Sequence, residues 1–176
     1  GYGAGGVAVF IEAATDNRNR TAGDIRSYFT KFGGNLGETG CVGWIFEPCG
    51  MISIDKPVEA GKRSKEEVKM FDFDKLFEDS MEFDPMDVFE DEDENDYKIK
   101  TTTDKLESTA KGLENLGYTI KSAAFTRIPS NSNEITDAAI AKKVVLLLEK
   151  LDEHDDVQNV YSNFEASDEI MNSIDI

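Results

Sequence analysis

The sequence predicts an α+β protein in which a ferredoxin-like domain is split by a second, smaller α/β domain. Apolar residues switch between the period of a strand and the period of a helix along the chain. The elements nearest the two ends combine to the order β-α-β-β-α-β, which is the ferredoxin-like order. We therefore expect a split domain over residues 1–57 and 131–166, a linker over 58–70, an inserted domain with an antiparallel sheet over 71–130, and a loose tail over 167–176.

The first two elements are a strand over residues 6–14 and a helix over residues 21–32. β-Branched and aromatic residues fill the first segment, which is typical of a buried strand. Thr21 is expected to cap the helix, with Asp24 reaching back to the cap from three residues later. Gly33 supplies the left-handed residue that ends the helix. One apolar stripe faces the core and contains Ile25, Tyr28, Phe29 and Phe32.

Two short strands follow and are expected to form a β-hairpin. Residues 41–47 and 51–55 are rich in β-branched and aromatic residues, and the Pro-Cys-Gly segment at 48–50 is the tight connection between them. The glycines of residues 1–6 spell G-x-G-x-x-G. In a phosphate cradle that motif opens a helix, whereas here it precedes a strand, so we interpret it as a flexible lead-in.

An acidic hairpin is the main feature of the middle domain. Residues 86–90 and 97–102 alternate as two strands around residues 91–96, and every charged residue from 78 to 96 is acidic. A calcium loop has a glycine at its bend and a glutamate at its end. Neither is in place, which favours a solvated hairpin tip. The short helix before the hairpin has one apolar face, made by Phe73, Leu76, Phe77 and Met81.

The remaining elements alternate between helix and strand. Asp104 begins a helix whose stripe is Leu106, Ala110, Leu113 and Leu116, and Gly117 stops it. A strand over residues 118–127 and a loop over 128–133 come next. The longest helix spans residues 136–151 and is followed by a strand over 157–164. We expect this last helix to pack beside the helix over residues 21–32, because the first segment alone leaves one sheet face half covered.

The acidic balance limits the function classes. The chain of 176 residues has a formal net charge of −17, so it repels phosphate backbones over about 8–10 Å at ordinary salt. Any contact with nucleic acid must then come from a local patch or from outside this chain. No apolar run approaches the roughly 20 residues that cross a bilayer.

Cysteine and histidine are too few to predict a metal centre. Cys41, Cys49 and His154 are the only residues of these types, and they make a poor set for structural zinc. We expect reduced cysteines in strands and no metal or organic cofactor. A catalytic assignment would need a convergent pocket and a shifted pKa, neither of which a sequence shows.

One locally basic place stands out, in the loop at residues 15–21 and the helix after it. The free N–H groups and positive dipole end of a helix N-terminus favour anions, and arginine adds forked donors that match phosphate. The alternative is that these cations only stabilise the loop and pair with Asp16 and Asp24. The candidate nucleic-acid- or anion-binding residues are Arg18, Asn19, Arg20, Arg26 and Lys31.

Several segments together resemble the YebC/PmpR family. Its members have a basic helical N-terminal domain and two α/β domains, the third inserted in the second. The present chain resembles the second and third, and differs in lacking the helical domain and in its extra polar stretch over residues 58–70. The matching segments are GGVAV at 5–9, TDNRNRT at 15–21, GGNLG at 33–37, Phe46-Glu47, Ile128-Pro129 and DDVQNVYSN at 155–163.

The resemblance implies a regulator of gene expression without an active site in this chain. Bacterial relatives are described as DNA-binding transcriptional regulators, and others act as translational activators at the ribosome. Nucleic acid or the ribosome is thus the implied partner, contacted through the basic N-terminal domain, with no membrane and no small-molecule substrate. The implied location is the bacterial cytoplasm or the mitochondrion of a eukaryote.

A protein-interaction module is the alternative function. In that case the acidic segment over residues 78–96 would bind a basic partner such as a ribosomal protein. A salt-dependent pull-down by nucleic acid, compared with one by a basic protein, separates the two hypotheses.

Overall fold

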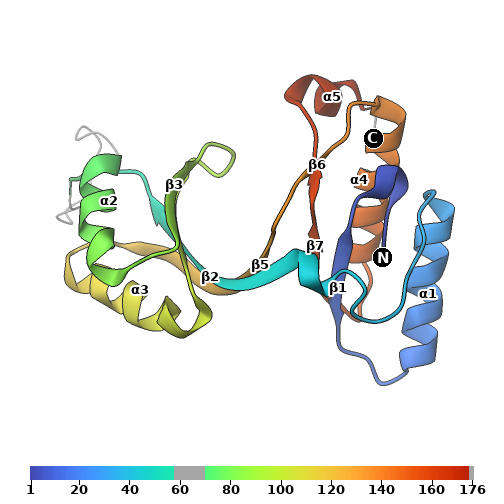
Figure 1. Ribbon diagram of the computed structural model, residues 1–176, viewed down its shortest axis with the longest axis horizontal. Coiled ribbons are helices and arrows are strands. Elements are labelled where there is room, and N and C mark those ends of the chain that lie inside the picture. Colours follow the sequence, from blue (N-terminus) through green and yellow to red (C-terminus); the bar gives the residue numbers. More distant parts are fainter. Residues whose placement is uncertain (58–69, 175–176) are drawn as a thin grey trace. The chain divides into compact units, whose positions relative to one another are not determined.

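The computed structural model describes residues 1–57 and 70–174 and confirms the α+β class (Figure 1). The chain divides into unit 1, Gly1–Glu47 with Ile128–Ile176, and unit 2, Pro48–Arg127. These boundaries differ from the expected ones because strands β2 (Phe46–Asp55) and β5 (Ile120–Pro129) each continue from one unit into the other. Except for Met70, the linker expected over 58–70 lies outside the described residues.

Unit 1 is built on an antiparallel pair of strands and two long helices. Strand β1 (Val9–Ala13) pairs with β7 (Val157–Ser162), with Ile11 opposite Val160. Helix α1 (Arg18–Lys31) follows β1, and α4 (Ala138–Asp152) precedes β7. Strands from the two ends of the sequence therefore lie side by side (Figure 1).

Helices α1 and α4 pack together over one core, as the sequence predicted. Phe29, Val144, Leu147 and Leu151 are fully buried in it, and Ile25 is nearly so. Tyr28 and Phe32 complete the predicted stripe from partly buried positions. Burying an aliphatic or aromatic side chain of this size contributes roughly 1.5–3 kcal/mol, so this core is the main reason that the separated segments stay together.

The start of α1 differs from the prediction. Asn17, not Thr21, is the N-cap, and its side chain accepts a hydrogen bond from the backbone N–H of Arg20 at 3.1 Å. The helix therefore begins three residues earlier, and Thr21 is buried inside it. The end is as predicted, with Gly33 in the left-handed region at φ +77°. Next to it, a Cβ on Gly34 would lie 2.5 Å from the carbonyl oxygen of Tyr2, so only glycine fits.

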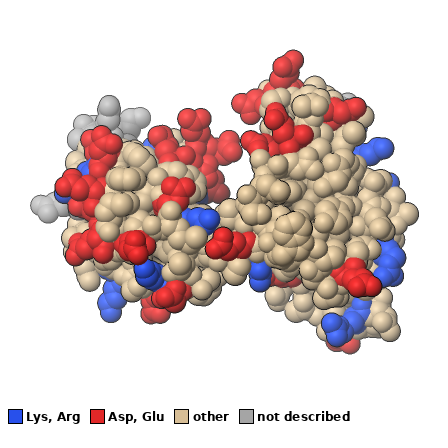
Figure 2. All heavy atoms as spheres, viewed as in Figure 1, with Lys and Arg blue, Asp and Glu red and all other residues tan. Residues whose placement is uncertain are grey.

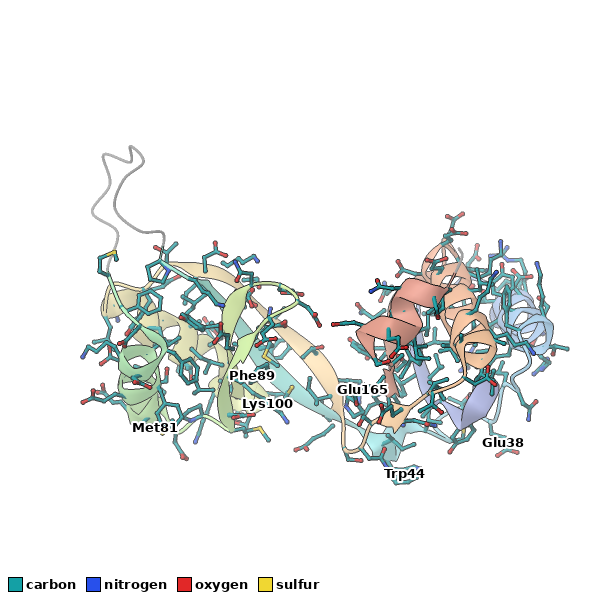
Figure 3. All side chains as sticks on the ribbon, turned by 90° about the horizontal axis from the view of Figure 1, so that it is seen from above. Glu38, Trp44, Met81, Phe89, Lys100 and Glu165 are labelled. Carbon is teal, nitrogen blue, oxygen red and sulfur yellow. The ribbon has the colours of Figure 1, made fainter. Side chains whose placement is uncertain are left out.

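The predicted hairpin over residues 41–47 and 51–55 is wrong. Gly43–Ile45 form a 3-10 turn, and β2 runs without a break from Phe46 to Asp55, so Pro48 and Gly50 lie inside one strand. Gly50 serves close packing: a Cβ there would lie 2.8 Å from Cβ of Leu106. Trp44 in the turn is 75% exposed (Figure 3), and its indole N–H donates to the carbonyl of Cys41.

The C-terminal region is more ordered than predicted. The final strand is interrupted at Asn163, so that β8 (Phe164–Glu165) pairs in parallel with β6 (Asn133–Glu134) in the segment predicted to be a loop. Where a loose tail was expected, Asp168–Ser173 form helix α5, which Ser167 caps at Ile170 N–H. Ile170 and Ile174 pack against the core of unit 1, which fixes this helix.

Unit 2 is an antiparallel sheet of order β3-β4-β2-β5 with two helices. Strands β3 (Asp87–Asp91) and β4 (Asp96–Thr101) form the predicted hairpin, and Ile52 of β2 pairs with Ile99 of β4. Helices α2 (Phe73–Ser80) and α3 (Leu106–Asn115) lie in the two segments where an apolar face predicted a helix.

The core of unit 2 uses only part of each predicted helix face. Leu76 and Leu113 are fully buried, together with Ile52 and Ile99 from the sheet. In contrast, the predicted face members Phe77, Met81 and Leu116 are 44%, 45% and 39% exposed. Within the described ranges, no helix is both long and apolar enough to cross a membrane.

Candidate nucleic-acid interface

The loop before α1 is held by its own polar side chains. Thr15 Oγ1 accepts a hydrogen bond from Asn17 N–H at 3.0 Å, and Asn17 in turn caps the helix. This arrangement places Arg18 at the first helical position, beside backbone N–H groups that have no intrahelical partner. The residues TDNRNRT thus fold locally into an exposed, basic helix start.

The turn before β7 anchors this helix start from the other end of the sequence. Asp156 Oδ2 lies 2.7 Å from Thr21 Oγ1 and 3.4 Å from Nη2 of Arg20, and Arg20 also contacts Asp16 Oδ1 at 3.1 Å. The hydrogen bond from Thr21, followed by the contact with Arg20, holds the pKa of Asp156 below its ordinary value. Arg20 is accordingly the member of the predicted set whose charge is compensated.

The predicted residues are all exposed but do not form one cluster. A helix turns by about 100° per residue, and Ile25 marks the face of α1 in the core. On that wheel Arg20 and Lys31 project toward the side of Tyr28, which contacts α4. Asn19 and Arg26 project from the opposite side. The structure therefore places four of the five candidates on two opposite sides of α1, and the fifth, Arg18, beside the pocket described next.

Arg18 lines a pocket of about 380 Å³ beside β1 and the start of α1. Apolar groups provide most of its wall, and Arg18 and Glu38 are its charged lining residues. Arg18 has no carboxylate partner among the described residues. The other residues that line the pocket are Gly1, Val9, Phe10, Ile11, Ala13, Thr15, Thr21, Ala22, Ile25, Leu36, Gly37, Thr39, Gly40, Cys41 and Val42.

Sequence reasoning missed the contribution of α4 to the basic surface. The ammonium of Lys150 lies over the ring of Tyr28, 5.5 Å from its centroid. Lys143 Nζ lies 3.9 Å from the position that a Cβ on Gly33 would take. His154 Nε2 is 3.0 Å from Asp24 Oδ2, so Asp24 contacts the turn that follows α4 instead of the cap. Both lysines are visible as polar positions of an amphipathic helix, but which side of α1 they meet depends on helix packing.

The ion pairs of the two units differ. In unit 1, Arg20 alone among the described Lys and Arg residues has a carboxylate partner. The cations without one are Arg18, Arg26, Lys31, Lys142, Lys143 and Lys150. In unit 2, carboxylates pair with Lys56, Lys75, Lys98, Lys105 and Lys121. Figure 2 shows basic side chains over α1, and many acidic ones on the visible face of unit 2.

Lysines neutralise part of the acidic hairpin. Oxygens of Asp91, Glu94 and Asp96 lie within 4.8 Å of one another. The ammonium of Lys98 contacts Glu94 and also lies 3.2 Å from Asp96, while Lys121 is 3.3 Å from Asp96. Burial lowers the pKa of Lys98, but these hydrogen bonds outweigh it and raise the pKa overall. Lysine thus neutralises the buried carboxylate, in agreement with a hairpin tip.

Fold and surface together define a two-unit α+β protein whose described residues present an exposed basic surface on two helices. Comparison with known proteins shows its family. Residues 1–164 match the model described as the TACO1/YebC second and third domain, and the chain belongs to this family. The resemblance drawn from the sequence motifs is thereby confirmed.

Curated relatives and one solved structure match over nearly the whole chain. A probable transcriptional regulatory protein of Desulfotalea psychrophila is 41% identical over 99% of this chain and 64% of its own length. One from Methylacidiphilum infernorum is 44% identical over 97% of this chain and 63% of its length. The crystal structure of a conserved hypothetical protein from Aquifex aeolicus has a TM-score of 0.76 and 40% identity, and covers 97% of this chain and 64% of that one. The chain therefore spans less than two thirds of these relatives.

Proposed function

We propose that this chain is part of a non-enzymatic regulator of gene expression that binds nucleic acid or the ribosome. The family and the names of its relatives, probable transcriptional regulatory proteins, support the general role. The observation that carries the proposal is the group of cations on α1, Arg18, Arg26 and Lys31, which have no carboxylate partner among the described residues. In a chain of net charge −17, acids are abundant enough to neutralise them, and the fold leaves them exposed.

The contact begins at the basic helix start. Arg18 combines a guanidinium fork with neighbouring N–H groups of the helix N-terminus, and both suit a phosphate group. The net charge of the chain opposes the approach of a polyanion, so binding by this chain alone is weak. A longer protein that carries a further basic domain, as the resemblance implies, binds more tightly through the same surface.

Fluorescence anisotropy with a labelled DNA duplex and a labelled single-stranded RNA tests the proposal. Between about 50 and 200 mM salt, log K should fall linearly with log salt concentration for a phosphate contact. Co-sedimentation with purified ribosomes in the same buffers tests the ribosomal form. Binding to any of these three partners supports the proposal. Failure of both this chain and the longer protein to bind all three overturns it.

The acidic surface of unit 2 supports a second function, binding of a basic protein. Six acids between residues 78 and 96 have no cation partner among the described residues: Glu78, Glu82, Asp87, Asp91, Glu92 and Asp93. A labelled lysine-rich peptide is the probe. If this function is correct, the peptide binds to the chain. Neutralising the charges of Glu92 and Asp93 then weakens peptide binding, whereas Arg18→Gln leaves it unchanged. Absence of peptide binding at low salt excludes this second function.

A further inference from the structure

Contacts between α1 and α4 follow a regular antiparallel register. Asp24 of α1 contacts His154, just after α4, and Tyr28 contacts Lys150. Gly33, just after α1, lies beside Lys143 of α4. As the residue number rises along α1, it falls along α4, so the two helices lie side by side in opposite directions (Figure 1). We call the line of contact between them the seam. The seam starts beside the Arg20–Asp156 contact and ends at the C-terminus of α1.

Three lysines line this seam without being neutralised. Lys31, Lys143 and Lys150 are exposed, and none has a carboxylate partner among the described residues. Two local effects hold them there. The negative dipole end of α1 favours Lys31 and Lys143, which lie at its last turn and at Gly33. Aromatic faces attract Lys31 and Lys150: Lys31 Nζ is 5.4 Å from the Phe32 ring centroid, and Lys150 Nζ is 5.5 Å from the Tyr28 ring centroid.

Neither the helix dipole nor the aromatic contacts neutralise the positive charges of these lysines. A helix end and an aromatic face position an ammonium group but do not cancel its field, whereas a carboxylate partner does. Lys143 and Lys150 are seven residues apart on α4, which places them about 10.5 Å apart along the helix axis and on nearly the same side. The seam therefore presents positive charges in a line along its length.

We propose that Lys31, Lys143 and Lys150 form a track along the α1–α4 seam that binds the phosphodiester backbone of a nucleic acid. The inference rests on the proposed function and adds residues from α4 to its interface. A row of separate ammonium groups matches a row of phosphates, because lysine acts on phosphate as a point charge. It contributes affinity without reading sequence, since backbone contacts position a nucleic acid and base contacts specify it.

Neutralisation of the α4 lysines tests the track against a matched control. The test variant carries Lys143→Gln and Lys150→Gln. The control carries Lys142→Gln and Lys111→Gln, which remove the same charge from exposed α4 and α3 positions that also lack carboxylate partners among the described residues. Lys142 is about 100° around α4 from Lys143, away from the seam. Glutamine preserves helix propensity in all four places.

Binding of the labelled DNA duplex and single-stranded RNA is measured across the salt series. The test variant should lose about 1.4 units of log–log slope on RNA and about 1.8 on duplex, at roughly 0.7 and 0.9 per phosphate contact. The control should keep the wild-type slope. Far-ultraviolet circular dichroism and urea unfolding verify that both variants are folded.

The possible results distinguish a failure of the track from a failure of the proposed function. If wild type binds and the test and control variants have equal slopes, the track is wrong and the proposed function stands. If both this chain and the longer protein bind none of the nucleic-acid probes or ribosomes, the track and the proposed function are both wrong. If the test variant loses binding to an acidic peptide but keeps the wild-type log–log salt slope for nucleic acid, the partner class assigned to the seam is wrong.

Discussion

Thr21 and Asp156 are joined by a hydrogen bond of 2.7 Å between Oγ1 and Oδ2, although 135 residues separate them in the sequence. Thr21 lies in the second turn of α1, and Asp156 lies in the turn that leads into β7. Two of the segments that carry the family resemblance, 15–21 and 155–163, thus meet at one point of unit 1. This contact fixes the basic helix start on the sheet pair β1–β7.

Loss of that hydrogen bond should destabilise the protein. Thr21→Val keeps the size and branching of the side chain but leaves the carboxylate of Asp156 without this donor. We expect the free energy of unfolding to fall by about 1.5 to 3 kcal/mol, as for other hydrogen bonds to charged groups. Urea unfolding measures it. Thr30→Val is the control on the same helix, because Thr30 is exposed and bonds only locally to the Arg26 carbonyl; it should change stability by less than about 0.5 kcal/mol.

Acid should weaken the same contact. The pKa of Asp156 is lowered in the folded protein, first by Thr21 and then by Arg20. A group with a lowered folded-state pKa contributes stability above its unfolded-state pKa, near 3.9, and loses it as pH falls through the lower folded-state value. Wild type should therefore be more stable than Asp156→Asn at pH 7, with the difference shrinking as pH falls below about 4. Denaturant unfolding from pH 7 to pH 3 measures it, and a gap that widens toward low pH would contradict the sign. Asp155→Asn, at the exposed neighbour, should follow wild type.

Two helical glycines should respond in opposite directions to the same substitution. A Cβ on Gly23 of α1 meets nothing within 4 Å, so Gly23→Ala should stabilise by about 0.5–1 kcal/mol through helix propensity. A Cβ on Gly112 of α3 would overlap the ring of Phe83. Gly112→Ala should thus destabilise by about 1–3 kcal/mol through overpacking. Thermal or urea unfolding of both variants measures the two changes in stability. Stabilisation by both substitutions would show that the Phe83 ring moves aside without cost.

Local signals predicted most elements of the fold. Helices α1, α3 and α4 have strong apolar periods, and apolar and polar residues alternate clearly in the acidic hairpin. The spacing of apolar residues alone therefore predicted these elements. The hairpin at 41–55 failed because Gly50 resembles a turn residue in the sequence. In the structure its missing side chain makes room for Leu106, a contact that only the tertiary fold creates. The tail was missed because α5 is short and depends on packing of Ile170 against the core.

The candidate site was only partly predictable. The basic loop is a local signal, and Arg18, Arg20, Arg26 and Lys31 are exposed as expected. The separation of Arg20 and Lys31 from Arg26 on α1 follows from which face of the helix the core buries. The link from Thr21 to Asp156, and the approach of Lys143 and Lys150 to α1, depend on the register of two helices that are far apart in sequence. Spacing within one helix carries no information on that register.

The two arginines of the loop should contribute differently to nucleic-acid binding. They look equivalent in the sequence, but the structure gives them different surroundings. Arg20 contacts Asp16 and Asp156, and the hydrogen bond to Asp156 is the largest cause of its raised pKa. Arg18 has no carboxylate partner among the described residues and lines the pocket beside the helix start. A phosphate can therefore approach Arg18 without displacing a carboxylate, whereas at Arg20 it must compete with two.

In binding experiments with the longer protein, Arg18→Gln should lower the log–log salt slope by about 0.7 on single strands and about 0.9 on duplex DNA, as for one lost phosphate contact. Arg20→Gln should change the slope less, because its positive charge is already shared with Asp16 and Asp156. Its effect on folding should also be small, since exposed ion pairs contribute about 0 to 1 kcal/mol. Anisotropy titrations of both variants across one salt series measure the difference. Equal loss of slope would mean that nucleic acid releases Arg20 from its carboxylates, and no loss in either variant would leave the loop with a purely structural role.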